Sequence, residues 1–186
     1  FLNSLKKLID LGKIRHIGLS NENPWGVMKF LELSNKNLPK MITIQNPYSL
    51  LNRLFEVGNA EICLRENTGL LAYSPLGFGV LSGKYLNGKI PEDSRLKLFP
   101  NLSRFAGEQS MKATEKYMKI SHEYGISLTH ISLAFVNSRS FVTSNIIGAS
   151  KLEQLKENIS SINVNLSKEI LGEIEKIHSL IPNPAP

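Results

Sequence analysis

Small polar residues and one aromatic residue occur where short apolar segments of the sequence end. There are four such clusters: Ser20-Asn21, Gln45-Asn46, Tyr73-Ser74 and Gly148-Ala149-Ser150. If the segments are parallel strands, the clusters meet at the carboxyl edge of one sheet, where α/β folds bind ligands. A single cluster is more often a loop or helix cap, but four together favour a ligand site. Tyr73 could stack on a flat ring or be a core tyrosine.

A glycine-rich segment, GFGVLSGKY (77–85), follows the third cluster. It fails as a phosphate-binding P-loop, because Gly77 leaves five residues before Gly83-Lys84 and Gly79 leaves three, where the motif needs four. It fails as a dinucleotide motif, because Ser82 stands where the third glycine belongs. The glycines would still let backbone N–H groups approach a pyrophosphate, with Lys84 and Arg95 to neutralise its charge.

A second phosphate candidate is GASKLEQLKEN (148–158). Gly148 permits close approach, Ser150 is a suitable N-cap, and Lys151 adds positive charge at the predicted helix start. On that helix one face carries side chains that suit a polar base or ribose: Gln154, Glu157 and Asn158. The alternative is an ordinary solvated helix face.

The sequence offers no convincing set of residues for acid–base catalysis or for binding a metal ion. The four histidines have no paired carboxylate constellation, and we expect them to be structural or exposed: His16, His122, His130 and His178. The single cysteine, Cys63, excludes an internal disulfide framework and a cysteine-based zinc site.

Alternating strand and helix patterns position these residues. We predict strands at 14–20, 41–46, 69–75 and 144–150, and helices at 2–11, 25–36, 55–67, 109–124, 127–139, 151–160 and 167–178. Segment 76–109 has no sustained periodicity and is too long for a passive connection. The order predicts an α/β fold with a parallel sheet.

Length and charge limit the classes of function. With 186 residues, one domain is expected. The net charge of +6 comes from scattered basic residues rather than one basic run, which argues against nucleic-acid binding. The sequence contains no apolar run long enough for a membrane helix, and a cytoplasmic location is the simplest expectation.

Four segments together resemble the aldo-keto reductase family, in particular its Tas-like bacterial members, which are related to the potassium-channel β-subunit group. They are GKIRHIGLSNENPWGV, TIQNPYSLLNR, LLAYSPLGFGVLSGKYLNG and NIIGASKLEQLKENI. The resemblance implies a (β/α)8 TIM barrel that binds NADP(H) and reduces aldehydes or ketones to alcohols by direct hydride transfer.

The resemblance also implies roles for individual residues. Ser20, Asn21 and Gln45 match the positions that hold the nicotinamide carboxamide, and Tyr73 matches the aromatic residue that stacks on its ring. The pyrophosphate loop is matched by Ser74, Pro75, Leu76, Gly77 and Phe78, and cationic cofactor contacts by Lys84 and Arg95. The adenosine end is matched by Gly148, Ser150, Gln154, Glu157 and Asn158, with Lys151 a weaker match near the 2′-phosphate.

The family's catalytic tetrad of Asp, Tyr, Lys and His has no match in this sequence. The helix at 2–11 resembles the fourth barrel helix, so residues 1–186 are expected to form the carboxyl-terminal portion of the domain: four β–α units and a last helix. We expect two unpaired sheet edges, apolar faces left uncovered, and no carbonyl reduction by this chain alone. A separate amino-terminal half-barrel is a possible partner; the alternatives are a non-catalytic NADP(H)-binding or regulatory module and a truncated inactive fragment.

Overall fold

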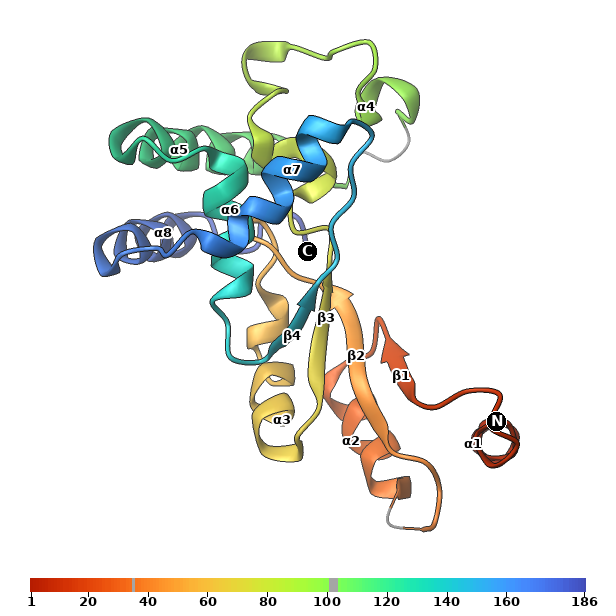
Figure 1. The fold of residues 1–186 in the computed structure, drawn as a ribbon. Helices are drawn as coiled ribbons and strands as arrows, with labels where there is room; N and C mark the ends of the chain where they lie inside the picture. Colours follow the sequence, from red (N-terminus) through yellow and green to blue (C-terminus); the bar gives the residue numbers. More distant parts are fainter. Residues whose placement is uncertain (35, 101–103) are drawn as a thin grey trace.

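The computed structural model describes residues 1–34, 36–100 and 104–186 (Figure 1). Residue 35 of the predicted helix 25–36 and residues 101–103 of the predicted loop lie outside the described residues. The strands are β1 (Ile17–Ser20), β2 (Met41–Pro47), β3 (Gly69–Tyr73) and β4 (Val142–Asn145). The α-helices are α1 (Leu2–Asp10), α2 (Pro24–Ser34), α3 (Asn59–Glu66), α4 (Arg95–Leu98), α5 (Glu108–Tyr124), α6 (Leu128–Asn137), α7 (Leu152–Ser160) and α8 (Lys168–Leu180). Short 3-10 helices are η1 (Leu54–Glu56), η2 (Gly77–Ser82), η3 (Leu86–Gly88) and η4 (Ser161–Asn163).

The four strands form one parallel sheet in the order β1-β2-β3-β4. Helices α2, α3 and α6 contact β2, β3 and β4 respectively, and Figure 1 shows α5, α7 and α8 gathered near α6. The loop that carries α4 extends beyond the carboxyl ends of the strands. This arrangement confirms the predicted parallel α/β architecture.

One face of the sheet packs against the helices. Leu19, Ile44 and Leu70 are register neighbours on β1, β2 and β3, and all three are buried in the hydrophobic core. Because successive side chains in a strand point to opposite faces, the residues between them lie on the other face. That open face carries Gly18-Thr43-Gly69 in one row and Ser20-Gln45-Leu71-Ser144 in the next.

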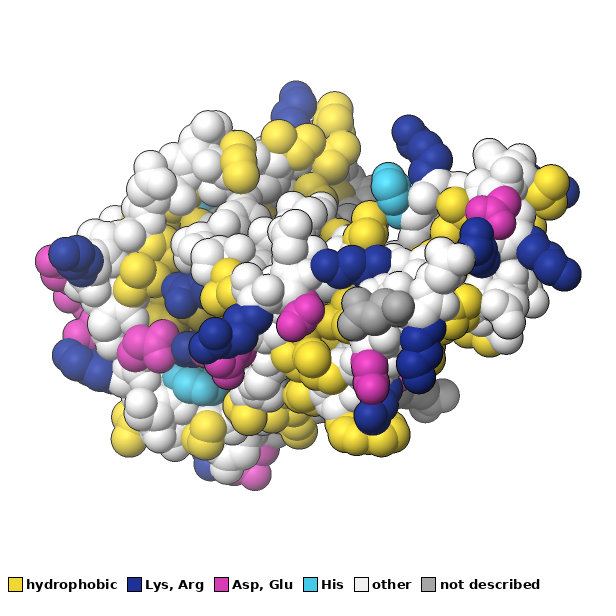
Figure 2. Space-filling view, turned by 90° about the horizontal axis from the view of Figure 1, so that it is seen from below, with side chains coloured by type: hydrophobic (Ala, Val, Ile, Leu, Met, Phe, Trp, Pro, Cys, Tyr) yellow, Lys and Arg dark blue, Asp and Glu magenta, His cyan; other side chains and the backbone are white. Residues whose placement is uncertain are grey.

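The expectation of uncovered apolar faces is wrong for the open face of the sheet, where glycine, threonine and other polar residues predominate. Exposed large apolar side chains lie elsewhere, including Leu11 just after α1, and Ile159 and Ile162 on α7 and η4. Figure 2 shows hydrophobic side chains between scattered basic and acidic ones on the face seen from below.

Several predicted boundaries shift, each for a local reason. The predicted strand 144–150 instead covers Val142–Asn145, because the β3 strand beside it ends at Tyr73. The predicted helix 55–67 begins only at Asn59, because Gly58 at φ +100° separates it from η1. The predicted strand 14–20 begins at Ile17, where pairing with β2 begins. No helix in the described parts of the chain combines the length and apolarity needed to cross a bilayer.

Candidate cofactor site

Three of the predicted nicotinamide contacts lie together on the open face. Ser20, the last residue of β1, is the register neighbour of Gln45, two residues before the end of β2, and Tyr73, the last residue of β3, is paired with Pro47. The Tyr73 hydroxyl donates to Asn21 Oδ1 at 2.7 Å, which fixes the orientation of the ring. The structure therefore brings Ser20, Asn21, Gln45 and Tyr73 to one edge of the sheet, as the sequence predicts.

A set of asparagines holds the turn that follows β1. The backbone N–H of Asn21 donates to the Gln45 carbonyl, which continues the ladder while Asn21 adopts φ +54°. Asn46 accepts from the Glu22 N–H and donates to the Glu22 carbonyl, and Asn59 Nδ2 donates to the same carbonyl at 3.2 Å. Asn59 was not singled out in the sequence, because its position inside a predicted helix gives no sign of this tertiary contact.

The loop after β3 leaves the strand through left-handed backbone conformations. Ser74, Gly77 and Phe78 have φ values of 55°, 53° and 56°. At Gly77 a Cβ atom would also lie 3.2 Å from Leu51 and 3.3 Å from Phe105, so both space and conformation favour glycine. Phe78 is held by an edge-on contact with Phe105. The predicted pyrophosphate loop, Ser74, Pro75, Leu76, Gly77 and Phe78, is thus a defined turn at the carboxyl end of β3.

Lys84 and Arg95 lie close to this loop. The Arg95 guanidinium is 4.5 Å from the centre of the Phe78 ring, and the Lys84 ammonium lies near Gly79 and 5.2 Å from the Tyr85 ring centre. Neither residue forms a salt bridge within the described part of the chain. Two cations without a carboxylate partner beside a glycine-rich loop suit an anionic ligand.

Lys151, by contrast, is already paired. Its ammonium lies 2.6 Å from Asp93, and both side chains are exposed. The hydrogen bond and charge of Lys151 lower the pKa of Asp93, and those of Asp93 raise the pKa of Lys151. This ion pair connects the long loop to the start of α7, the two segments expected to flank a cofactor.

The side chains predicted for the adenosine end make contacts within the protein. Ser150 is not the N-cap of α7: Lys151 occupies that position, and the Ser150 hydroxyl and N–H both donate to Gln154 Oε1. Asn158 is 4% exposed and donates to the Gly148 carbonyl, so a solvated face is the wrong interpretation for this residue. Glu157 accepts from the Ser127 hydroxyl at the start of α6.

Two of the histidines contact other parts of the protein. His130 Nε2 lies 3.0 Å from the Glu157 carbonyl and the Ser160 hydroxyl, a structural contact between α6 and α7. His178 is partly buried near Arg53, and both its burial and the Arg53 charge lower its pKa. No group of three His, Cys, Asp or Glu residues in the described chain is placed to hold a metal ion.

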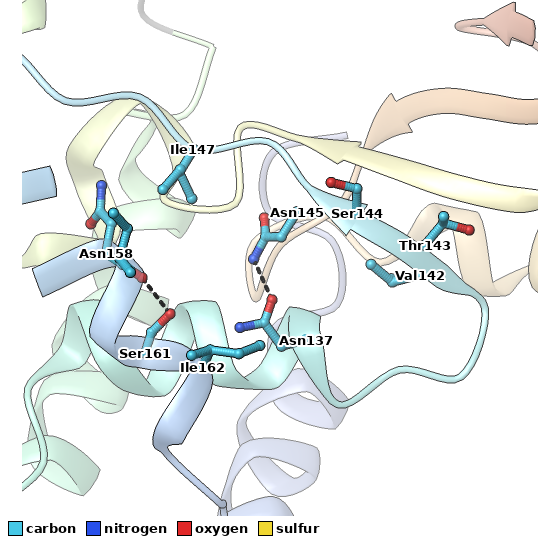
Figure 3. A pocket seen from close by; sticks show the side chains of 10 residues that line it. Asn137, Val142, Thr143, Ser144, Asn145, Ile147, Asn158, Ser161 and Ile162 are labelled. Atoms are coloured by element: carbon cyan, nitrogen blue, oxygen red, sulfur yellow. Dashed lines mark hydrogen bonds between the residues drawn. The ribbon is translucent and has the colours of Figure 1, made fainter. Parts of the chain in front are cut away.

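A cavity of about 330 Å³ lies along β4, away from the predicted nicotinamide contacts (Figure 3). Asn145 donates to Asn137 Oδ1 at 3.0 Å on one side of it, and Ser161 donates to the Asn158 carbonyl on the other. The rest of the lining is formed by Val142, Thr143 and Ser144 of β4 and by Ile147, Ile159 and Ile162. The cavity therefore borders the outer strand of the sheet.

Comparison with known proteins places this sequence in a family. The family model described as "Aldo/keto reductase family" matches residues 1–179. The chain is 49% identical to Protein tas of Escherichia coli (strain K12), covering 100% of this chain and 54% of that protein. It is 32% identical to an L-glyceraldehyde 3-phosphate reductase of Escherichia coli O157:H7, covering 94% of this chain and 52% of that protein. It is 30% identical to a probable voltage-gated potassium channel subunit beta of Oryza sativa subsp. japonica, covering 95% of this chain and 56% of that protein.

These values confirm the resemblance to the Tas-like members and to the potassium-channel β-subunit group. The chain spans about half the length of these relatives. The match extends over nearly all of the strands and helices described above, and the chain therefore belongs to the aldo/keto reductase family.

Proposed function

We propose that this chain supplies the cofactor-binding part of an NADP(H)-dependent aldo-keto reductase that reduces aldehydes or ketones to alcohols. The observation that supports this most strongly is the shared location of Ser20, Gln45 and Tyr73 at one edge of the sheet. Bound NADPH would supply the hydride. The residues of this chain would bind and orient the cofactor.

The residues at that edge fit a nicotinamide. An amide and a hydroxyl, from Gln45 and Ser20, can bond both atoms of a carboxamide. The half-buried Tyr73 ring, fixed by its bond to Asn21, offers an aromatic surface for stacking. Stacking on one side of the nicotinamide leaves its other side for the carbonyl substrate.

Preference for NADPH over NADH would come from cations near the phosphates. Lys84 and Arg95 are free of salt bridges among the described residues, so they can bind phosphate without first losing a carboxylate. Lys151 would have to leave Asp93, although an ion pair exposed to solvent on both sides is weak. We therefore assign Arg95 to the 2′-phosphate, which only NADPH carries, and Lys84 to the pyrophosphate.

The proton for carbonyl reduction would come from outside this chain. Tyr48 donates to Glu56, and burial and this hydrogen bond raise its pKa far above the ordinary value. Burial likewise raises the pKa of Tyr117. A tyrosine that donates a proton near neutral pH needs a lowered pKa instead. The positive charge of a neighbouring lysine would lower it. This supports the proposal that the chain alone is inactive.

Four further β–α units would provide the tetrad and close the barrel. They would pair with the outer strands, β1 and β4, and cover the cavity beside β4.

The second candidate function is a non-catalytic NADP(H)-binding or regulatory module, which the raised pKa values of Tyr48 and Tyr117 would also fit. An upstream reading frame with the Asp, Tyr, Lys and His set favours the reductase, and a frame without it favours the module.

The test is cofactor titration of the chain co-expressed with the amino-terminal half of Protein tas. We expect Arg95→Ala to weaken NADPH binding about tenfold and NADH binding by less than about twofold, because only NADPH carries the 2′-phosphate. Arg65→Ala, in the exposed Arg65–Glu61 pair of α3, is the matched control and should change neither. Equal weakening of both cofactors by Arg95→Ala would contradict its proposed role.

A further inference from the structure

The segment 181–186, which follows α8, is bonded to parts of the chain that are far away in the sequence. Its sequence, IPNPAP, alternates proline with other residues. Proline fixes its own φ and has no N–H, so the segment cannot continue the helix and has few backbone donors. Residues 181–186 are called the proline strap below.

Hydrogen bonds to the segment 51–53 hold the proline strap in place. The Ala185 N–H donates to the Leu51 carbonyl at 3.1 Å, and Asn183 Oδ1 accepts from the Arg53 N–H at 2.6 Å. Ala185 and Leu51 are both buried. Asn183 has φ +45°, a left-handed conformation that asparagine tolerates better than most residues. Local spacing gives no sign of these contacts, because the bonded residues lie about 130 positions apart.

The proline strap also contacts the end of the long loop and the start of α5. Arg104 Nε donates to the Pro186 carbonyl at 3.0 Å, and the Ser110 hydroxyl donates to the Pro184 carbonyl at 3.2 Å. Phe105, the residue after Arg104, is buried in the hydrophobic core. The proline strap therefore fixes the chain next to Phe105 as well.

Leu51 and Phe105 are the two side chains against which Gly77 packs. A Cβ atom at Gly77 would lie 3.2 Å from Leu51 Cδ1 and 3.3 Å from the Phe105 ring. The Phe105 ring also contacts Phe78 edge-on, with 4.8 Å between the ring centres, and the Arg95 guanidinium lies over the Phe78 ring. Figure 1 marks the end of the chain close to the segment that follows β3. A series of contacts thus connects the proline strap to the candidate pyrophosphate loop.

The backbone of that loop depends on its surroundings. Phe78 has φ +56°, and a bulky residue keeps a left-handed conformation only where neighbouring groups impose it. The Phe105 ring is such a neighbour, and it is itself fixed next to the bond between Arg104 and Pro186. Loosening the proline strap should therefore let the loop leave its present conformation.

We propose that Asn183 and Ala185 are positioning residues for the cofactor, because the proline strap holds the candidate pyrophosphate loop through Leu51 and Phe105. A loop that is already in its binding conformation loses less conformational entropy when a ligand binds, so its affinity is higher. The effect on affinity rests on the proposed cofactor role of the loop. The coupling between the strap and the loop does not depend on that role.

Amide hydrogen exchange on the 186-residue chain tests the coupling without any cofactor. The N–H groups of Gly77, Gly79 and Leu81 are hydrogen-bonded within the loop, so they should exchange slowly. We expect Asn183→Gly to speed their exchange about tenfold, because glycine tolerates φ +45° but cannot accept the Arg53 N–H. The amides of β2 should not change, whereas a merely structural role of Asn183 would speed exchange in both places.

Three further variants make the result specific. Asn183→Asp keeps a side-chain acceptor for the Arg53 N–H and should retain slow loop exchange. Ser167→Ala is the matched control: it removes the bond to the Ile170 N–H at the opposite end of α8 and should leave the loop amides unchanged. A chain that ends at Pro182 loses both bonds to the segment 51–53 and should show the same selective increase as Asn183→Gly. Should that shortened chain fail to fold, Asn183→Gly decides alone.

Cofactor titration of the co-expressed assembly then tests the consequence. We expect Asn183→Gly to weaken the binding of both NADPH and NADH about threefold to tenfold, because both carry the pyrophosphate. Unchanged loop exchange, an equal increase in loop and sheet, or faster loop exchange with unchanged NADPH affinity would each overturn the proposal. An assembly that binds no NADPH but shows the selective exchange would count against the proposed reductase function and would support the coupling.

Discussion

Glycine and threonine residues form the layer of side chains next to the candidate site on the open face of the sheet. A Cβ atom at Gly18 would lie 2.3 Å from Thr43 Oγ1, and one at Gly69 would lie 1.7 Å from Thr143 Oγ1. The side chains of β2 and β4 thus fill space above the glycines of β1 and β3. The same arrangement occurs inside parallel barrels, where the side chains of one layer come from alternate strands. This layer supports the row of Ser20, Gln45, Leu71 and Ser144 above it.

Replacing one of these glycines should therefore destabilise the sheet. We expect Gly69→Ala to lower the free energy of unfolding by about 1–3 kcal/mol, because Thr143 must move. Gly172→Ala in α8 has nothing within 4 Å of the new Cβ and should stabilise the chain by up to about 1 kcal/mol. Urea denaturation measures both. Equal stability of the Gly69→Ala variant and the unmodified chain would show that the layer is not closely packed.

At the residue level the sequence predicted the shared location of Ser20, Gln45 and Tyr73 better than the hydrogen bonds made by the residues assigned to the adenosine end. Ser20, Gln45 and Tyr73 could be placed together because parallel strands end at a common edge. The bond of Glu157 to Ser127 joins residues 30 positions apart, and nothing in the local spacing indicates it. The cofactor roles of these residues remain predictions.

Helices were predicted reliably where capping residues and periodicity agreed. Asn23 accepts from the Gly26 N–H at the start of α2, and Ser167 accepts from the Ile170 N–H at the start of α8. Strand lengths were predicted less well, because a strand ends where its neighbour ends, as β4 does beside β3. Within its described residues, 76–100 and 104–109, the long segment contains only η2, η3, the four-residue α4 and the first residues of α5, so its lack of periodicity was informative.

The contact between α8 and the segment 53–56 makes stability dependent on pH. Burial, together with the Arg53 charge, lowers the pKa of His178, while Glu56 and Glu175 act in the opposite direction. In the unfolded chain, His178 therefore takes up a proton near pH 6.5, whereas in the folded chain it takes up the proton only at lower pH. Stability should fall as the pH drops below about 6.5, until the folded histidine is protonated as well.

Thermal unfolding at about pH 7.5 and about pH 5.5 tests this contribution. We expect the fall in melting temperature to be smaller in His178→Gln than in the unmodified chain, by about 2 °C. His122→Gln is the control, because His122 is exposed on α5, and it should leave the fall unchanged. An identical fall in all three proteins would show that His178 does not contribute.

At the largest scale, the described residues form an open four-stranded sheet, whereas the fold of the family is a closed (β/α)8 barrel. The outer strands of the open sheet, β1 and β4, both run in the same direction, so β4 of one sheet can pair in parallel with β1 of another. An unpaired strand edge is a template for association. Beside β4 the exposed Ile159 and Ile162, which line the cavity of Figure 3, add apolar surface to that edge.

We therefore expect the isolated chain to self-associate through the β4 edge. Sedimentation velocity over a range of concentrations should show a species larger than the monomer. Ile162→Lys should weaken this association about tenfold, because Ile162 is 69% exposed and a charge there would have to be desolvated beside β4. Leu64→Lys on α3 places the same charge at a residue that is 59% exposed and distant in sequence from β4, and it should leave association unchanged. A chain that remains monomeric at every concentration and unfolds in one sharp transition would show that the four strands are stable without a partner at their edges.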